Sequence, residues 1–275
     1  MTPELSPDHT PLSLSPDLLE ALGRVAATEH LLVAMDFDGT MAPLVDHAGD
    51  ARALPRSAAA FAALTELPRT TTALISGRAL DSLREVAFPP EKTLLIGSHG
   101  AEVWMGPGSS KLELDQDRRE LLADVRRELE GIVELAPGTL LEDKPAGVVL
   151  HTRLAANDVA EDAVAAARAA LQDRPGVYLK SGNRVLETSV VHSSKGEGLA
   201  FLRQASGATA TVFAGDDTTD EDAQASLLPG DVGVKVGLDF TQAQFRIEAP
   251  AHISELLEAL LRLRRRALGL PDSAA

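Results

Sequence analysis

The feature that most constrains the fold is a recurring order of short apolar run, polar turn and helix. Leu31–Met35 is a continuous apolar run, as expected of a strand buried on both faces, and it stops abruptly at Asp36. The same order returns around apolar runs at Thr72–Ile75 and Leu94–Ile96, with helical patterns between the runs. Strands that alternate with helices predict a parallel sheet with helices on its faces.

The middle of the chain departs from this order. Gly106-Pro107-Gly108 interrupts it, and an amphipathic helix is expected at Gln116–Glu130. A strand, an Ala-rich helix and a hairpin around Ser181-Gly182-Asn183 follow, and the first order resumes from Ser194. We therefore predict a core domain formed by both chain ends and interrupted by a small α+β cap. The expected segments are a loose N-terminal arm at 1–17, a core at 18–105 and 190–275, and a cap at 106–189.

Composition narrows the class of protein. The chain has 275 residues, of which 44% are apolar and 24% charged, as in ordinary globular domains. Its 41 acidic against 26 basic residues give a net charge of −15, which disfavours binding to nucleic acid or anionic lipid. Without cysteine there is no thiolate nucleophile, disulfide or cysteine zinc site. The N-terminus lacks a basic start followed by an apolar run, so we expect a cytoplasmic protein that does not bind membranes.

The first chemical motif is Asp36-Phe37-Asp38-Gly39-Thr40, directly after the first strand. An isolated Asp-Gly usually marks a turn or a helix cap. Two carboxylates leaving a buried strand within three residues are a narrower pattern. One carboxylate can attack phosphorus, while the other gives a proton to the leaving oxygen and later takes one from water. The motif therefore favours catalysis over a turn alone.

Three more motifs have a structural and a functional interpretation. Gly215-Asp216-Asp217 follows another apolar run and is either a turn or a second acidic site. Lys195 precedes a predicted helix and is either a surface charge or a phosphate ligand. Ser76 ends the second strand and either caps the next helix or binds phosphate there.

Together these motifs resemble those of the haloacid-dehalogenase-like (HAD) phosphatases. The resemblance implies that Asp36 is the nucleophile, Asp38 the general acid and base, and that Ser76 and Lys195 bind phosphate. It implies an α/β fold with a Rossmann-like parallel-sheet core and an inserted α+β cap of type C2B. It also implies a metal site formed by Asp36, Asp38, Asp216 and Asp217.

The charges of the reaction explain why a cation is needed. Two unit charges about 4 Å apart repel by roughly 4 kcal/mol at an effective dielectric constant of 20, so a carboxylate approaches a phosphate dianion only with help. Mg²⁺ suits the acidic turns because it prefers oxygen ligands. Zinc is disfavoured, since the chain has no cysteine and no paired-histidine helix motif.

Longer stretches narrow the resemblance to the trehalose-6-phosphate phosphatases. They are DFDGTMAPLV from Asp36, LISGR from Leu74, IGSHGAE from Ile96, EDKPAGVVLHTR from Glu142 and FAGDDTTDEDA from Phe213. The resemblance implies hydrolysis of trehalose 6-phosphate, with polar cap residues that bind the sugar hydroxyls. The implied substrate-binding residues are Gly77, Arg78, His99, Glu142, Lys144, His151, Arg153, Asn183 and Glu187.

Several of these residues keep a structural alternative. Glu142 and Lys144 lie two apart and share a strand face, where they could form a cross-strand ion pair on a solvated sheet. His151 is as consistent with a structural role as with a substrate contact.

The chain also departs from the family pattern. Thr188-Ser189-Val190 stands where Arg-Pro is usual after Leu186-Glu187, Thr152 replaces a tyrosine, and Gln224 replaces a phenylalanine. These changes bear on the substrate more than on the reaction. Another sugar phosphatase, acting on sucrose, mannosyl or hexose phosphates, and a catalytically silent sugar-phosphate sensor are the alternatives. We expect a monomer whose partner is a small sugar phosphate, with no nucleic-acid or membrane partner.

Overall fold

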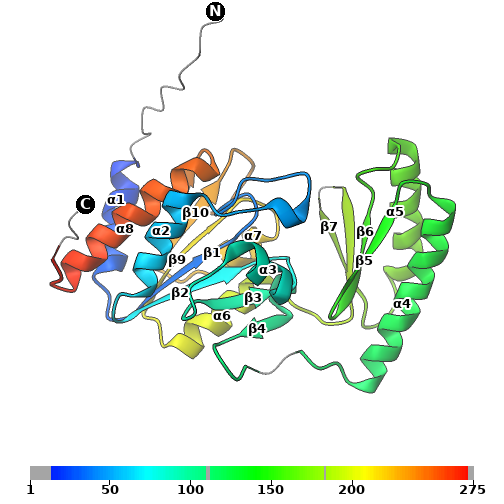
Figure 1. Ribbon diagram of the computed structural model, residues 1–275, viewed down its shortest axis with the longest axis horizontal. Helices are drawn as coiled ribbons and strands as arrows, with labels where there is room; N and C mark the ends of the chain where they lie inside the picture. The colour runs from blue at the N-terminus through cyan, green and yellow to red at the C-terminus, as the bar shows by residue number, and fades with distance from the viewer. Residues whose placement is uncertain (1–13, 110–111, 183, 272–275) are drawn as a thin grey trace, which may run out of the picture. The chain divides into compact units, whose positions relative to one another are not determined.

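The computed structural model describes residues 14–109, 112–182 and 184–271, and the chain divides into two compact units (Figure 1). Unit 1 comprises Met1–Ile75, Arg84–Leu94 and Lys195–Ala275. Unit 2 comprises Ser76–Leu83 and Leu95–Ser194. This division groups residues 76–83 and 95–105 with the predicted cap, and the predicted domain boundaries remain a prediction.

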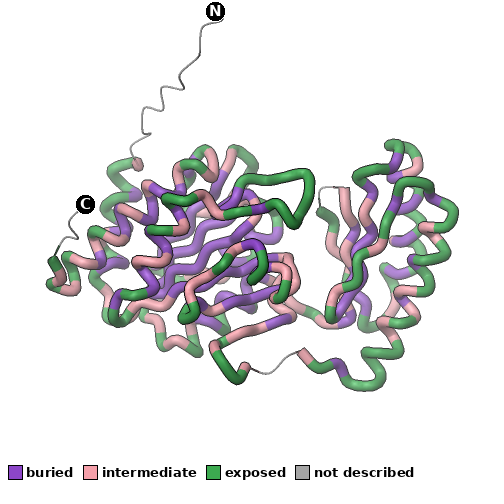
Figure 2. Tube along the Cα trace, viewed as in Figure 1, coloured by how far each residue is buried: buried purple, intermediate pink, exposed green. Residues whose placement is uncertain are grey.

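Unit 1 contains a parallel sheet with the strand order β11-β10-β9-β1-β2, and every pair in it is parallel. The strands are β1 (Leu31–Met35), β2 (Thr70–Ile75), β9 (Ala210–Gly215), β10 (Val232–Val236) and β11 (Phe245–Ile247). Figure 2 shows these central strands as buried, and every residue of β1, β9 and β10 is buried. Burial on both faces explains why their sequences are apolar runs without alternation.

Two groups of helices pack on this sheet (Figure 1). The first group is α1 (Pro16–Ala26), α2 (Pro55–Thr65) and α8 (Ile253–Ala267), and the second is α6 (Lys195–Ser206) and α7 (Asp220–Ala225). α1 begins inside the predicted arm because Ser15 accepts a hydrogen bond from Leu18 N and proline occupies the first helical position. α3 (Leu80–Ala87) has residues in both units.

Strand register determines where the polar turns lie. Met35 pairs with Leu74 on one side and with Ala214 on the other, so β1, β2 and β9 end level with one another. Asp36 follows β1, and Gly215 ends β9 just before Asp216. The two acidic turns predicted from sequence therefore lie at the same edge of the sheet, where ligands bind in parallel α/β sheets.

Unit 2 contains an antiparallel sheet with the order β5-β6-β8-β7. Its strands are β5 (Leu140–Lys144), β6 (Gly147–His151), β7 (Tyr178–Gly182) and β8 (Val185–Ser189). α4 (Gln116–Leu135) and α5 (Asn157–Leu171) pack on Val148, Leu150 and Leu186, which all point to one face (Figure 1). β3 (Leu94–Gly97) pairs antiparallel with β4 (Glu102–Trp104) elsewhere in the unit. The predicted parallel α/β core with an α+β insert is confirmed.

The other face of this sheet carries polar side chains. Because direction alternates along a strand, residues directly opposite one another share a face. Glu142 lies opposite Val149, which lies opposite Glu187, which lies opposite Lys180. The polar residues predicted in the cap are thus gathered on the face that α4 and α5 leave uncovered.

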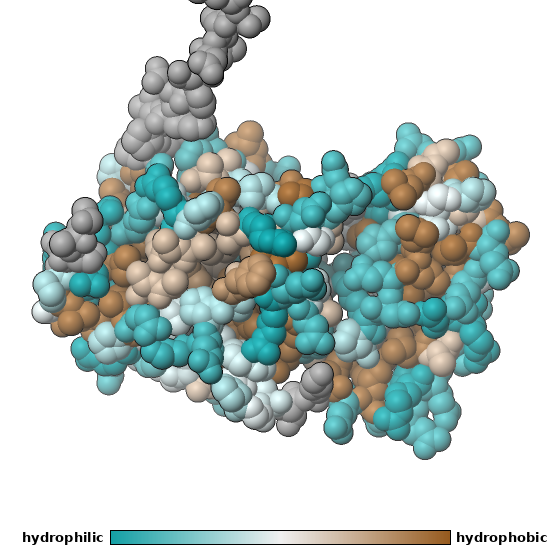
Figure 3. Space-filling view, viewed as in Figure 1, coloured by the Kyte–Doolittle hydropathy of each residue, from teal (hydrophilic) through white to brown (hydrophobic). Residues whose placement is uncertain are grey.

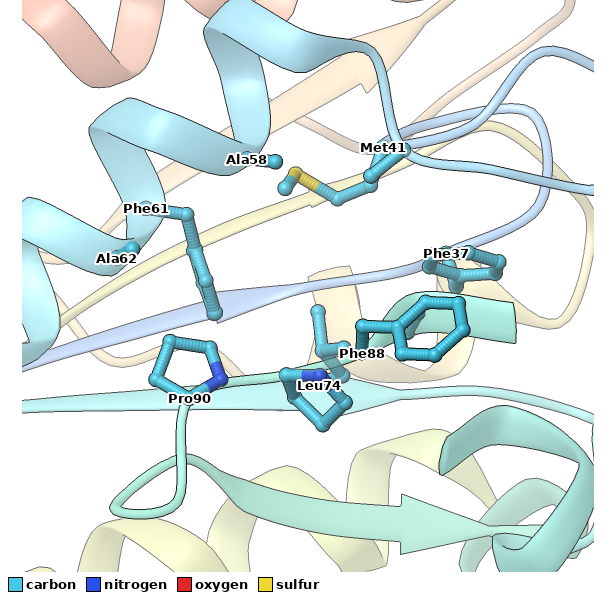
Figure 4. A pocket seen from close by; sticks show the side chains of 11 residues that line it. Phe37, Met41, Ala58, Phe61, Ala62, Leu74, Phe88 and Pro90 are labelled. Carbon is cyan, nitrogen blue, oxygen red and sulfur yellow. The ribbon is translucent and has the colours of Figure 1, made fainter. Parts of the chain in front are cut away.

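Unit 1 also contains an apolar cavity of about 280 Å³ behind the Asp36–Thr40 turn (Figure 4). Phe37, Met41, Phe61 and Leu74 are among its lining residues, and Phe88 lies at its rim with 72% of its surface exposed. Its lining has no charged side chain, so a sugar phosphate would find no polar partner there. Phe37, which stands between the two aspartates in the sequence, is buried and lines this cavity.

The face drawn in Figure 3 has hydrophilic side chains interspersed with groups of apolar ones, as is usual for folded proteins. In the described ranges, the helices are too short or too polar to cross a lipid bilayer.

Candidate active site

Backbone contacts fix the turn that carries the two aspartates. Asp36 N donates to Ala214 O at 2.9 Å, which ties the end of β1 to β9. Phe37 O accepts from Ala42 N at 2.8 Å, and this closes the turn. Gly39 has a φ of +84°, and a Cβ there would lie 2.0 Å from Asp216 Oδ2. Glycine is therefore required both by the turn and by the close approach of Asp216.

Lys195 joins the two acidic turns. Its Nζ donates to Asp36 Oδ1 and to Asp220 Oδ1, both at 2.7 Å. It is the first residue of α6 and only 2% exposed, so the interpretation as a surface charge is wrong. A buried ammonium is tolerated where carboxylates surround it, as they do here.

Asp220 is a site residue that the sequence reasoning missed. Its Oδ2 accepts from Asp216 N and Asp217 N, each at 3.0 Å, while its Oδ1 binds Lys195. It thus shapes the turn and holds the lysine at once. The available signal was an aspartate four residues after Asp216, at the start of a helix.

Two predicted metal ligands have other positions. Asp217 Oδ1 accepts from Thr219 N at 2.6 Å, Thr219 Oγ1 at 2.7 Å and Asp220 N at 3.1 Å, so it caps the start of α7. Asp38 is half-buried, and its backbone bridges to Ala42. Neither belongs to the group of close carboxylates that the described residues form, and their predicted role as ligands remains a prediction.

Charge imbalance shifts the pKa values of this cluster. Burial, together with Asp220 and Asp216, raises the pKa of Asp36 well above its usual value despite Lys195. Burial and the charges of Asp220 and Asp217 raise the pKa of Asp216 to about 7. Burial alone would lower the pKa of Lys195, but Asp220, Asp36 and Asp217 raise it. The cluster holds more negative charge than one lysine neutralises.

These residues fit a divalent cation. Asp36, Asp216 and Asp220 each offer an oxygen, and the three atoms lie within 4.8 Å of one another. Asp36 Oδ2 is buried and has no hydrogen-bond partner in the described part of the chain. Both Asp220 oxygens already accept hydrogen bonds, so Asp36 and Asp216 are the better placed ligands. An all-oxygen donor set suits Mg²⁺.

The predicted phosphate residues of the second strand lie in unit 2. Ser76 is buried, and its Oγ accepts from Arg78 N at 3.1 Å, which forms a turn ahead of α3. Arg78 Nη1 donates to Ser82 Oγ at 3.4 Å. A Cβ on Gly77 would lie 2.5 Å from the ring of His99, so glycine admits that ring. The structure thus explains the Ser-Gly-Arg spacing locally, and phosphate binding by Ser76 remains a prediction.

A second group, whose members are half-buried, brings together four predicted residues. Lys144 Nζ donates to Gly77 O at 2.8 Å and lies 3.6 Å from Glu187 Oε2. His99 Nε2 lies 3.0 Å from the same Glu187 oxygen. Burial would raise the pKa of Glu187, but His99, Lys144 and Lys180 outweigh it and lower the pKa to about 2. Sequence reasoning missed Lys180, because its pairing with Glu187 depends on the β7–β8 register.

The remaining predicted residues lie apart from this group. Glu142 Oε2 and His151 Nε2 are 2.7 Å apart, and this hydrogen bond lowers the pKa of Glu142. The pair resembles the cross-strand alternative, except that histidine is the partner in place of Lys144. Arg153 is exposed beyond the end of β6. Asn183 lies outside the described residues.

Three of the unusual residues have structural roles. Gln224 is buried, and its Nε2 donates to Val234 O at 3.1 Å. Ser189 Oγ donates to Val191 O at 2.8 Å. Thr152 is buried, and its Oγ1 donates to Arg184 O at 3.1 Å.

The sequence is similar to a family of known proteins over most of its length. A family model described as trehalose-phosphatase matches residues 34–248. The chain belongs to the trehalose-phosphatase family. A trehalose-phosphate phosphatase of Mycobacterium avium is 35% identical over 269 residues, covering 90% of this chain and 67% of the relative. One from Mycobacterium marinum is 33% identical over 260 residues, covering 89% and 65%. The chain thus spans about two thirds of the length of these relatives.

Solved structures support the same fold. The C-terminal domain of trehalose-6-phosphate phosphatase from Candida albicans superposes with a TM-score of 0.75 at 21% identity, covering 95% of this chain and 100% of that one. A haloacid-dehalogenase-like hydrolase from B. subtilis gives 0.58 at 15% identity, covering 82% and 98%. The predicted HAD fold and the resemblance to the trehalose-phosphatase family are confirmed, and membership in that family supports a phosphatase. The C2B cap type remains a prediction.

Proposed function

We propose that this member of the trehalose-phosphatase family hydrolyses trehalose 6-phosphate to trehalose and inorganic phosphate, as the last step of trehalose biosynthesis, with Mg²⁺ as cofactor. The observation that carries the proposal is the buried Lys195, which binds Asp36 and Asp220 beside Asp216. Lys195 holds the proposed nucleophile, Asp36, in a site where the negative charges of the carboxylates outnumber the positive charges. A cytoplasmic location, a monomeric state and a lack of other partners remain predictions.

The first chemical step forms a bond from Asp36 to phosphorus. A carboxylate oxygen of Asp36 attacks, the bond from phosphorus to the sugar oxygen breaks, and an aspartyl phosphate forms. Lys195 holds Oδ1 of Asp36 in place, which limits the ways that the carboxylate can turn. When bound by Asp36 and Asp216, Mg²⁺ would supply positive charge that offsets the repulsion between carboxylate and phosphate.

Asp38 completes both steps by moving one proton. It gives a proton to the departing sugar oxygen, so that a neutral hydroxyl leaves. In the second step it takes a proton from water, the water oxygen bonds to phosphorus, and the bond to Asp36 breaks. Phosphate and the free carboxylate of Asp36 result, and Asp38 again carries a proton.

Sugar recognition is proposed for the polar residues of unit 2. A disaccharide presents many hydroxyls, which carboxylates, lysines and histidines can bind. Glu187, Lys144 and His99 are charged or polar, closely spaced and only partly exposed. His99 Nε2 lies 3.0 Å from Glu187 Oε2, and the proposal places a sugar hydroxyl beside this pair.

Phosphate release from a panel of sugar phosphates tests the proposal. We expect rapid release from trehalose 6-phosphate with Mg²⁺, and little without it or from the Asp36→Asn variant. Equal rates on glucose 6-phosphate or sucrose 6-phosphate would favour a broader sugar phosphatase. No release above the metal-free control would favour the silent sensor.

A further inference from the structure

A second buried lysine lies beside the acidic cluster. Lys235 is on β10, directly opposite Gly215 in the register with β9, and is only 2% exposed. Its Nζ donates a hydrogen bond to the backbone carbonyl of Asp216. Burial of an ammonium is costly unless it is paired and hydrogen-bonded, so the partners of the Lys235 ammonium explain how its burial is tolerated.

Glu221 accounts for the charge of this lysine but not for its hydrogen bond. Glu221 Oε1 lies 3.8 Å from Lys235 Nζ. The same carboxylate is held by Thr241 Oγ1 at 2.9 Å and by Gln242 N at 2.7 Å. Glu221 is therefore a fixed counter-ion, and the lysine's hydrogen bond is directed to the turn that carries Asp216.

That turn is restrained on both sides of Asp216. Asp220 Oδ2 accepts from Asp216 N at 3.0 Å, and Lys235 binds Asp216 O. Between these two contacts, the Asp216 carboxylate packs against Gly39, close to Asp36. With its backbone fixed at the amide and at the carbonyl, Asp216 has few ways to turn its carboxylate aside.

We propose that Lys235 is a positioning residue, which presets the Asp216 carboxylate for binding Mg²⁺ by holding the Asp216 carbonyl. The proposal rests on the metal site of the proposed function. Residues that orient metal ligands typically alter metal affinity about 10- to 100-fold when removed. Lys235 acts through Asp216 and touches neither phosphate nor metal in this account.

A purely structural role is the competing explanation, and another buried cation provides the control. Arg264 is 1% exposed, and its Nη1 donates to the backbone oxygens of Ala26 at 2.9 Å and Thr28 at 2.6 Å. Like Lys235, it binds backbone carbonyls in unit 1. These carbonyls precede β1, at the end of the strand opposite Asp36.

The test measures Mg²⁺ binding by calorimetry, without substrate, in full-length variants whose folding is verified by circular dichroism. We expect Lys235→Met to weaken the Mg²⁺ affinity by ~10-fold or more, and saturating Mg²⁺ to restore most of kcat. Arg264→Lys should lower the Tm but leave the Mg²⁺ affinity within about twofold of the unsubstituted chain, since it lies outside the shell that orients the ligands.

Each outcome has a defined meaning. Unchanged affinity in a folded Lys235→Met variant overturns the positioning role, as does equal weakening in Arg264→Lys. Should Lys235→Met fail to fold, Lys235→Gln takes its place. Its shorter amide falls short of the Asp216 carbonyl, so the same weakening is expected and unchanged affinity again overturns the proposal. If the unsubstituted chain binds no Mg²⁺, the metal site itself is refuted.

Discussion

Asp36 in unit 1 is buried and Glu187 in unit 2 is half-buried, and each carboxylate lies close to a lysine, yet their pKa values move in opposite directions. Burial with Asp220 and Asp216 raises the pKa of Asp36. Around Glu187 the effect of burial is outweighed by His99, Lys144 and Lys180, which lower its pKa to about 2. Asp36 is surrounded mainly by other carboxylates, whereas Glu187 is surrounded by lysines and a histidine.

The difference shows what each site still requires. The cluster around Asp36 has a buried oxygen without a hydrogen-bond partner and an excess of negative charge, so it favours a further cation. The group around Glu187 already has its counter-charges, so it suits neutral hydroxyls that exchange hydrogen bonds. Under the proposed function, unit 1 supplies the charged groups of the reaction and unit 2 the groups that bind the neutral sugar.

The largest expected effect comes from replacing the nucleophile. Asp36→Asn should reduce kcat on trehalose 6-phosphate by ~10⁴-fold or more, because the amide cannot form the covalent intermediate. Glu187→Gln should chiefly raise KM and should leave hydrolysis of p-nitrophenyl phosphate, which has no sugar, nearly unchanged. Initial-rate kinetics on both substrates measures this. A similar loss on both substrates from Glu187→Gln would break the distinction between the two sites.

The next effect concerns stability without metal. The pKa of Asp216 is about 7 in the fold and lies below that when unfolded, so this carboxyl lowers stability increasingly as pH rises from about 4 to 7. Asp216→Asn should therefore stabilise the metal-free protein at pH 8 by about 4 kcal/mol. Thermal unfolding in EDTA measures the change. A Tm below that of the unsubstituted chain would contradict the excess of negative charge.

The Glu187 carboxylate should have the opposite effect on stability from that of Asp216. Its pKa is depressed to about 2 in the fold, so its contribution is complete above the unfolded pKa, near 4.5, and is lost as pH falls through about 2. Glu187→Gln should therefore cost about 3 kcal/mol at pH 7 and progressively less at pH 4 and below. Urea unfolding at several pH values checks this. A cost that does not depend on pH would show that Glu187 contributes by packing and not by charge.

The smallest effect distinguishes two neighbouring aspartates. Asp217 caps α7 with an oxygen that asparagine also offers, whereas Asp216 faces Asp36. Asp217→Asn should change the Mg²⁺ affinity by less than about threefold, against ~10-fold or more for Asp216→Asn. Calorimetric titration of both variants compares them. Equal losses would make Asp217 a ligand, as the sequence motif suggested.

What the sequence predicted correctly is mostly local. Asp36 and Asp216 follow apolar runs, and parallel strands bring such ends together, so their proximity follows from the fold class. The burial of Lys195 could not be predicted from the residues next to it in the sequence, because it depends on ion pairs with carboxylates 159 and 25 residues away. Lys180 and Lys235 were missed for the same reason, because cross-strand register decides what each of them meets.

Trapping the intermediate tests the central claim most directly. Asp38→Asn with p-nitrophenyl phosphate should form the phosphoenzyme, since nitrophenolate leaves without a proton, but break it down slowly for want of a base. Acid quenching and peptide mass mapping should then find phosphate on Asp36, and none when Asp36→Asn is added. Phosphate released in the first turnover, with no adduct on Asp36, would contradict the account.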